Sequence, residues 1–134
     1  MEIVTSDGKR FFDAGGADDW KSLHSTVLIR LADYKEKIPL VLKFFETGRC
    51  EGIEAQETAR QFNLVRDALS RFSPDEAVYD YKSPQVPIPW LSSISPIVTS
   101  CANLYTTAEG QDLLFELVSI MTYASIKKVS VGVQ

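Results

Sequence analysis

The sequence predicts a single α+β domain, residues 1–134, with about three main helices packed on a small sheet of four or five short strands. Apolar residues recur at helical spacing through the middle of the chain, whereas short β-type segments lie near both ends. Hydrophobic residues make up 45% of the chain and charged residues 24%, which is the composition of an ordinary globular domain with its own core.

The strands are expected at the two ends of the chain. Residues 3–5 and 10–12 are β-type segments, and the intervening Asp7-Gly8 pair is typical of a type I′ hairpin turn, in which both central residues have positive φ. Valine alternates with other residues over 129–133, as in a strand. We therefore expect a terminal strand that joins the N-terminal hairpin.

Two helices are predicted after the hairpin. The first covers about residues 18–35, with Asp18 as a candidate N-cap, and its core-facing stripe repeats every three or four residues. The members of this stripe are Trp20, Leu23, Val27, Leu31 and Tyr34. Pro39 then begins a second, short helix and Gly48 ends it. A strand through residues 38–45 is the alternative, which the lack of alternation disfavours.

A third, longer helix of about residues 54–72 follows the break at Gly48–Gly52. Apolar residues spaced by three and four positions predict one buried face, formed by Phe62, Val65, Leu69 and Phe72. The opposite face is expected to be solvated and carries Glu57, Arg60, Gln61, Asp67 and Arg71. Asp67 and Arg71 are four residues apart, which is the spacing of a helical ion pair.

The connection to the last helix is expected to hold less regular structure. Residues 78–81 are predicted to form a short strand, residues 97–102 a helical turn or two, and residues 103–106 another strand. Four prolines between positions 83 and 96 argue against regular structure there. Trp90, within this stretch, either packs on the domain or is presented to a partner, and we favour packing.

The last helix covers about residues 108–125, opened by Thr107, and is predicted to be the centre of the core because apolar residues surround most of it. Its polar stripe is narrow and consists of Asp112, Glu116 and Ser119. Residues 83–126 contain no Lys or Arg. This indicates either a mostly buried C-terminal third or an acidic functional surface, and we favour burial.

Charge and cysteine content limit the function. The formal net charge is −4, whereas a nucleic-acid-binding protein needs a basic stripe; an acidic field instead steers a basic protein partner. Cys50 and Cys101 are too few for a disulfide framework and predict reduced thiols. No signal-peptide pattern and no apolar run of ~20 residues is present. We therefore expect a cytoplasmic protein.

No catalytic or cofactor-binding motif is found. A metal site needs several converging ligands, and one histidine with two cysteines does not provide them. His24 is expected at a helix surface or an interface rather than as a base for Cys50. Carboxylate pairs such as Glu54 and Glu57 are expected to be solvated charges near a helix end. We therefore expect no enzyme, no metal and no cofactor.

Binding is the remaining function, and acidic and aromatic residues gather in two segments at the ends of the third helix. One segment contributes Glu46, Glu51, Glu54 and Glu57, and the other contributes Asp75, Glu76, Tyr79, Asp80 and Trp90. Aromatic residues are common anchors at interfaces, and carboxylates suit a basic partner. Because a helix of about 18 residues spans ~27 Å, the segments form either two patches or one groove.

The order of these motifs resembles bacterial immunity proteins of contact-dependent growth inhibition and related polymorphic-toxin systems. The resemblance covers about residues 38–125. It includes a helix opening at residues 38–40, a break at residues 50–52, a long charged helix and a proline-rich loop. Residues 104–110 then lead into an aliphatic helix with Leu113, Leu114 and Leu117.

The resemblance implies a small cytoplasmic protein that binds the C-terminal domain of a cognate toxin, often a nuclease, and blocks it. Contact residues cannot be transferred from such a family, so the nine acidic and aromatic residues above are our own prediction of the toxin-binding site. A small enzyme that uses scattered carboxylates or Cys50 with His24 is one alternative. An adaptor or scaffold subunit is another, and the oligomeric state stays open.

Overall fold

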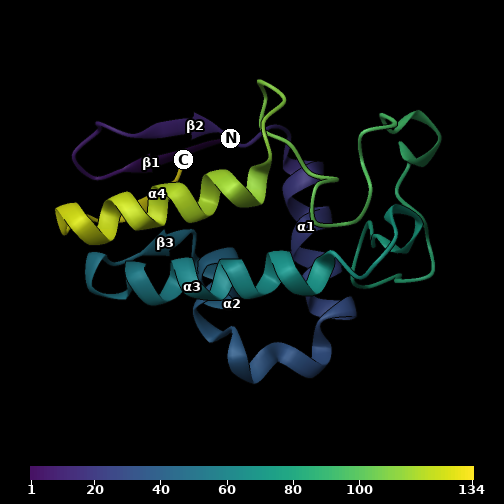
Figure 1. Cartoon of the computed structure of the whole chain (residues 1–134), viewed down its shortest axis with the longest axis horizontal. Coiled ribbons are helices and arrows are strands. Elements are labelled where there is room, and N and C mark those ends of the chain that lie inside the picture. The colour runs from purple at the N-terminus through teal and green to yellow at the C-terminus, as the bar shows by residue number, and fades with distance from the viewer.

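A computed structural model describes all residues from 1 to 134 and has the predicted α+β architecture (Figure 1). Its strands are β1 (Glu2–Thr5), β2 (Phe11–Asp13), β3 (Arg49–Cys50) and β4 (Val131–Val133). Its α-helices are α1 (Ala17–Arg30), α2 (Pro39–Thr47), α3 (Gly52–Leu69) and α4 (Leu113–Lys127). Three 3₁₀ helices complete the fold: η1 (Ala32–Lys37), η2 (Pro74–Glu76) and η3 (Leu91–Ser93). No helix has both the length and the apolar content that crossing a membrane requires.

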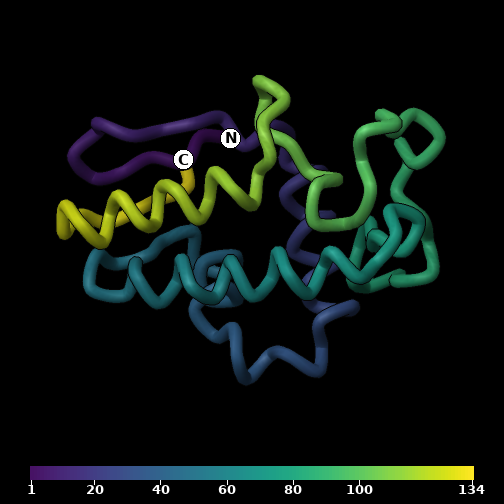
Figure 2. The backbone as a smooth tube through the Cα atoms, viewed as in Figure 1, coloured from purple at the N-terminus to yellow at the C-terminus, as the bar shows by residue number.

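The four strands form one antiparallel sheet in the order β2-β1-β4-β3. The predicted pairing of the C-terminal strand with the hairpin is confirmed, because Ile3 is the register partner of both Phe12 and Val133. Glu2 and Gln134 exchange two backbone hydrogen bonds (3.1 and 2.7 Å), so the two ends of the chain lie side by side (Figure 2). The two-residue strand β3 was not predicted.

The type I′ turn was wrong. Only Gly8 has a positive φ (71°), and four residues rather than two separate Thr5 from Arg10, whose carbonyl accepts from the Thr5 N–H. The Asp7 carboxylate accepts hydrogen bonds from the Thr5 hydroxyl (2.6 Å) and the Lys9 N–H (3.0 Å). This side-chain bonding holds the longer loop and replaces the turn that an Asp-Gly pair usually forms.

Helices α3 and α4 run side by side through the middle of the molecule, with the β1–β2 hairpin beyond α4 and α2 beyond α3 (Figure 1). The prediction that the last helix is the central core element is confirmed. Its buried residues are Leu113, Leu114, Leu117, Ile120, Met121 and Ala124. A Cβ atom at Gly52 would lie 2.8 Å from the Val129 carbonyl oxygen, so the close approach of α3 to the end of α4 requires glycine there.

Helix α3 begins two residues earlier and ends three residues earlier than predicted, and one residue of its expected solvated face is buried. Gln61 is 4% exposed, and its Oε1 atom accepts from the N–H groups of Leu40 (2.8 Å) and Val41 (3.3 Å). It thereby satisfies donors in the first turn of α2, which have no partner within that helix. The predicted Asp67–Arg71 ion pair is present (3.0 Å).

The first two helices agree with the prediction except at their ends. Helix α1 is capped by Gly16 rather than Asp18, which lies in the first turn. The chain leaves the α-helix after Arg30 and continues as the 3₁₀ helix η1. Helix α2 begins at Pro39 as predicted and ends at Gly48, whose φ of 69° is left-handed.

The strand predicted over residues 78–81 is absent because side chains of α1 take the place of a partner strand. The Val78 N–H donates to Thr26 Oγ1 (2.9 Å), and the Val78 carbonyl accepts from the Ser22 hydroxyl (2.8 Å). Ser22 and Thr26 are also hydrogen-bonded to the hydroxyl of Tyr105 (2.8 and 2.9 Å). The connection is therefore fixed to α1 without a sheet.

The helical turns predicted over residues 97–102 and the strand over residues 103–106 were also wrong. The Asn103 side chain holds a loop there, since its Oδ1 accepts from the N–H groups of Thr99 (3.0 Å) and Ser100 (3.1 Å). Only an isolated bridge between Thr106 and Asp112 remains of the strand.

Helix α4 starts at Leu113 rather than after Thr107, because residues 107–111 form a tight turn in which the Thr107 N–H donates to the Gln111 carbonyl (2.7 Å). Asp112 is the N-cap and accepts from the Phe115 N–H (3.1 Å). The expected burial of the C-terminal third holds for the inner side of α4 and for five residues of the loop before it: Ser100, Cys101, Leu104, Tyr105 and Thr107. Of residues 83–99, Ile88 alone is buried.

Candidate functional site

His24 and Cys50, the side chains considered above as a possible base and nucleophile, each pack against other side chains and do not contact each other. His24 stacks on Phe45 with the ring centroids 4.7 Å apart, and burial lowers the pKa of its imidazole. Cys50 lies against the Thr58 hydroxyl (3.4 Å), and burial raises the pKa of its thiol. No hydrogen bond joins these two groups, and no cluster of three or more His, Cys, Asp or Glu side chains could hold a metal ion.

At the N-terminal end of α3, the predicted carboxylates are exposed or half-buried, and three of the four have a cation of the same chain beside them. The ion pairs are Glu51–Arg49 (2.6 Å), Glu54–Lys43 (2.9 Å) and Glu57–Arg60 (2.5 Å). Glu46 is exposed at the end of α2 and has no ion pair. The structure therefore brings these four residues near one helix end, on a surface of mixed charge.

At the C-terminal end of α3, the predicted carboxylates also have local partners. The Glu76 side chain accepts from the Ser73 N–H (2.9 Å) in a capping box around η2, and Asp75 accepts from the Ser73 hydroxyl. Asp80 pairs with Lys21 (3.2 Å). The Lys82 N–H and Lys21 together hold the pKa of Asp80 below its usual value.

The two predicted aromatic anchors pack against each other. The rings of Tyr79 and Trp90 meet edge to face, with centroids 6.1 Å apart, and both side chains are half-buried against the core. Lys21 lies 5.6 Å above the Tyr79 ring. The packing interpretation of Trp90 is therefore confirmed. The two predicted segments lie at opposite ends of an 18-residue helix, which gives two patches rather than one groove.

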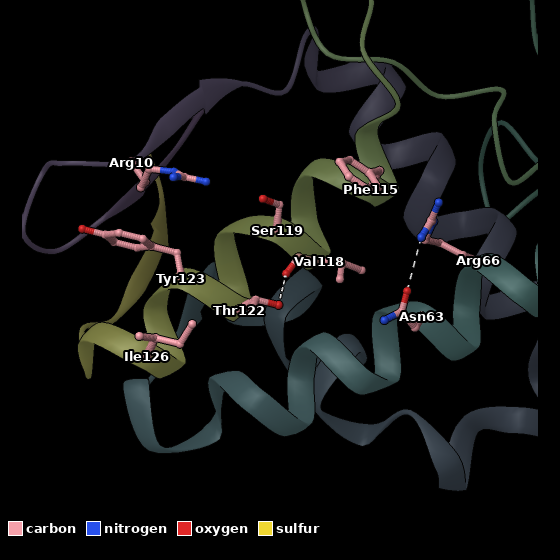
Figure 3. A pocket seen from close by; sticks show the side chains of 9 residues that line it. All are labelled: Arg10, Asn63, Arg66, Phe115, Val118, Ser119, Thr122, Tyr123 and Ile126. Atoms are coloured by element: carbon pink, nitrogen blue, oxygen red, sulfur yellow. Dashed lines mark hydrogen bonds between the residues drawn. The ribbon is translucent and has the colours of Figure 1, made fainter.

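A groove that the sequence reasoning missed lies along the outer side of α4 (Figure 3). We call it the α4 groove; its volume is about 560 Å³. Three elements line it: Arg10 before β2, Asn63 and Arg66 on α3, and Phe115, Val118, Ser119, Thr122, Tyr123 and Ile126 on α4. Phe115 and Ile126 are 53% and 69% exposed, which is unusual for large apolar side chains of a central core helix.

Two arginines face the α4 groove from opposite sides (Figure 3). The Arg10 guanidinium lies 5.1 Å from the centre of the Tyr123 ring, and that of Arg66 lies 5.5 Å from the centre of the Phe115 ring. The signal for this site was the helical spacing of Phe115, Ser119, Thr122 and Ile126, which share one face of α4. The composition of this helix, apolar around most of its circumference, does not distinguish this exposed face from the core.

Comparison with known proteins identifies the family. A protein-family model described as Immunity protein 70 matches residues 5–133, which also includes the N-terminal part that the resemblance left out. No curated protein and no solved structure matches the chain. Immunity proteins are typically non-catalytic inhibitors, in agreement with the prediction that the chain is not an enzyme. The chain belongs to the Immunity protein 70 family, and its function is to neutralise a cognate toxin of a polymorphic-toxin system.

Proposed function

We propose that this immunity protein inhibits its toxin by occluding the active site of the toxin's C-terminal domain, and that this domain is a basic nuclease. The observation that carries the proposal is the concentration of carboxylates at both ends of α3 in a chain of net charge −4. A nuclease needs a positively charged surface to hold the phosphates of its substrate. A protein that presents carboxylates to that surface competes directly with nucleic acid.

The contact residues that we propose are the nine predicted from the sequence: Glu46, Glu51, Glu54, Glu57, Asp75, Glu76, Tyr79, Asp80 and Trp90. The ion pairs that several of these carboxylates form do not remove them from binding. Exposed ion pairs contribute little to stability, so a toxin Lys or Arg can replace the cation of the same chain. Tyr79 and Trp90, already packed edge to face, would offer a preorganised aromatic edge.

We place the protein in the cytoplasm of a cell protected against contact-dependent growth inhibition. Both cysteines are free and buried, which agrees with a reducing compartment where thiols persist.

The proposal is tested by growth rescue. The chain is co-expressed with the toxin domain encoded beside its own gene, and survival is scored against cells that express the toxin alone. We expect survival with this chain and no survival with an immunity protein of another family. Failure to rescue growth, together with no binding of the purified domains, would remove the proposal.

The nuclease activity is tested separately, with the purified toxin domain and labelled DNA and RNA. We expect cleavage that stops when this chain is added in equimolar amount. If the toxin domain kills cells but cleaves neither substrate, the nuclease part of the proposal is wrong and neutralisation by binding still holds.

A further inference from the structure

We propose that the α4 groove binds a segment of the cognate toxin in which apolar side chains lie next to carboxylates. The inference rests on the proposed function, because the toxin is the partner that it assigns to the groove. It goes beyond that function because the groove contains none of the nine residues proposed above and differs from them in charge.

The apolar part of the inference comes from Phe115, Val118 and Ile126. All three line the groove; Phe115 and Ile126 are exposed there, whereas Val118 is half-buried and packs against the core at the base of the groove (Figure 3). Phe115 and Ile126 are eleven residues apart, which corresponds to about 16 Å along a helix. This length matches about three turns of a partner helix or about five residues of a partner strand. Apolar side chains of that segment would remove the exposed rings and methyl groups from water.

The charge of the segment follows from Arg10 and Arg66. Each guanidinium lies near an aromatic ring of α4, and neither is within ion-pair distance of a carboxylate. Arg66 has only a long hydrogen bond to the Asn63 side chain (3.3 Å). An arginine placed against a ring can direct its N–H groups to a carboxylate in a two-bond arrangement.

No carboxylate of the chain forms an ion pair with either arginine, and three acidic residues on the elements around the groove are engaged elsewhere. The Asp7 carboxylate accepts from the hydroxyl groups of Thr5 and Tyr123. Asp67 pairs with Arg71, and Asp112 caps α4. The chain thus presents two free cations beside apolar side chains although its net charge is −4. A basic segment would be repelled there, whereas an acidic and apolar one complements both features.

The groove lies on a different side of α3 from Glu54, one of the carboxylates at the N-terminal end of that helix. Glu54 and Asn63 are nine residues apart, which is two and a half helical turns and places them on opposite sides of the helix. Glu54 faces Lys43 of α2, whereas Asn63 lines the α4 groove. A toxin that uses both surfaces must therefore present a basic region and a separate acidic, apolar segment.

The test measures the Kd for the purified cognate toxin domain by calorimetry. Two variants alter the groove, F115A/I126A and R10E/R66E. Two matched controls lie outside it: F11A, which removes a phenylalanine that is 64% exposed, and K37E, which reverses a cation placed 5.5 Å from the Tyr34 ring. We expect the groove variants to raise the Kd at least tenfold and the controls to change it less than twofold. Thermal melting checks that every variant is folded.

Charge reversal on the toxin tests the carboxylates directly. A toxin Asp or Glu changed to Lys should restore affinity for R10E/R66E but not for F115A/I126A. The inference is overturned if the wild-type chain binds the toxin and both groove variants bind equally well, which would leave the proposed function standing. No binding by the wild type would overturn both. Light scattering gives the oligomeric state. If the wild type is a dimer, F115A/I126A is a monomer and toxin affinity is unchanged, the groove binds a second copy of this chain and the inference is wrong.

Discussion

The two sides of α4 have similar side chains and different surroundings. On the inner side, Leu114, Leu117 and Met121 are completely buried in the core that α4 shares with α3. On the outer side, Phe115 and Ile126 are mostly exposed in the α4 groove. The inner side therefore holds the fold together, and the outer side is free for a partner. Apolar composition alone does not separate the two roles, because burial depends on which elements of the chain cover the helix.

The largest expected effect separates folding from binding on this one helix. L117A removes a completely buried side chain from the inner side of α4 and should lower the free energy of unfolding by about 2–5 kcal/mol. F115A truncates a side chain that is half exposed and should lower the free energy of unfolding by only about 0.5 kcal/mol. Urea unfolding followed by circular dichroism measures both. Equal losses of stability in the two variants would show that Phe115 belongs to the core, and the outer side of α4 would then not be free for a partner.

Local periodicity was sufficient to predict most of the fold. The apolar spacing of Phe62, Val65 and Leu69 predicted the buried face of α3, and the valines near the C-terminus predicted a strand that pairs with the hairpin. These predictions hold because helical and strand periods are set by backbone geometry within a few residues. The ends of the helices were less accurate, since capping depends on single residues such as Asp112.

The connection over residues 77–112 could not be predicted in the same way. Its conformation depends on hydrogen bonds from Ser22 and Thr26, which lie more than 50 positions before Val78 in the chain. No local pattern reports such contacts, and the β-type residues of the segment suggested a strand instead. Long-range contacts likewise decided that Gln61 is buried against α2.

For the binding surface, sequence reasoning located the carboxylates but not their partners. It predicted the Asp67–Arg71 pair because both residues lie on one helix, and it did not foresee that Glu54 meets Lys43 of another helix. The α4 groove was missed because the exposure of Phe115 depends on the positions of α3 and the hairpin, which periodicity does not give.

A smaller effect on stability is expected at the start of α4, where Asp112 caps the helix and also fixes the first turn, which carries Phe115. D112A removes the hydrogen bond from the Phe115 N–H and should cost about 1 kcal/mol of stability. Because the first turn would then fray, Phe115 would lose its fixed position beside Arg66, and the Kd for the toxin should rise. D112N keeps an acceptor and is the control. A stable D112A variant with unchanged Kd would show that the groove does not need an ordered helix start.

The smallest effect on stability is expected from the carboxylates at the N-terminal end of α3, which form the other proposed toxin contact besides the α4 groove. The triple variant E51Q/E54Q/E57Q removes three exposed or half-buried carboxylates that form only surface ion pairs, so its melting temperature should change little. Its association with the toxin should be slower and less dependent on salt, because fewer charges steer the encounter. The matched control, D33N/E36Q/E109Q, removes three exposed carboxylates elsewhere and should keep most of the association rate and its salt dependence. If stopped-flow measurements give the same rates for both triple variants, the acidic end of α3 is not a contact surface, and binding would then have to depend on the α4 groove or on the segment around Trp90.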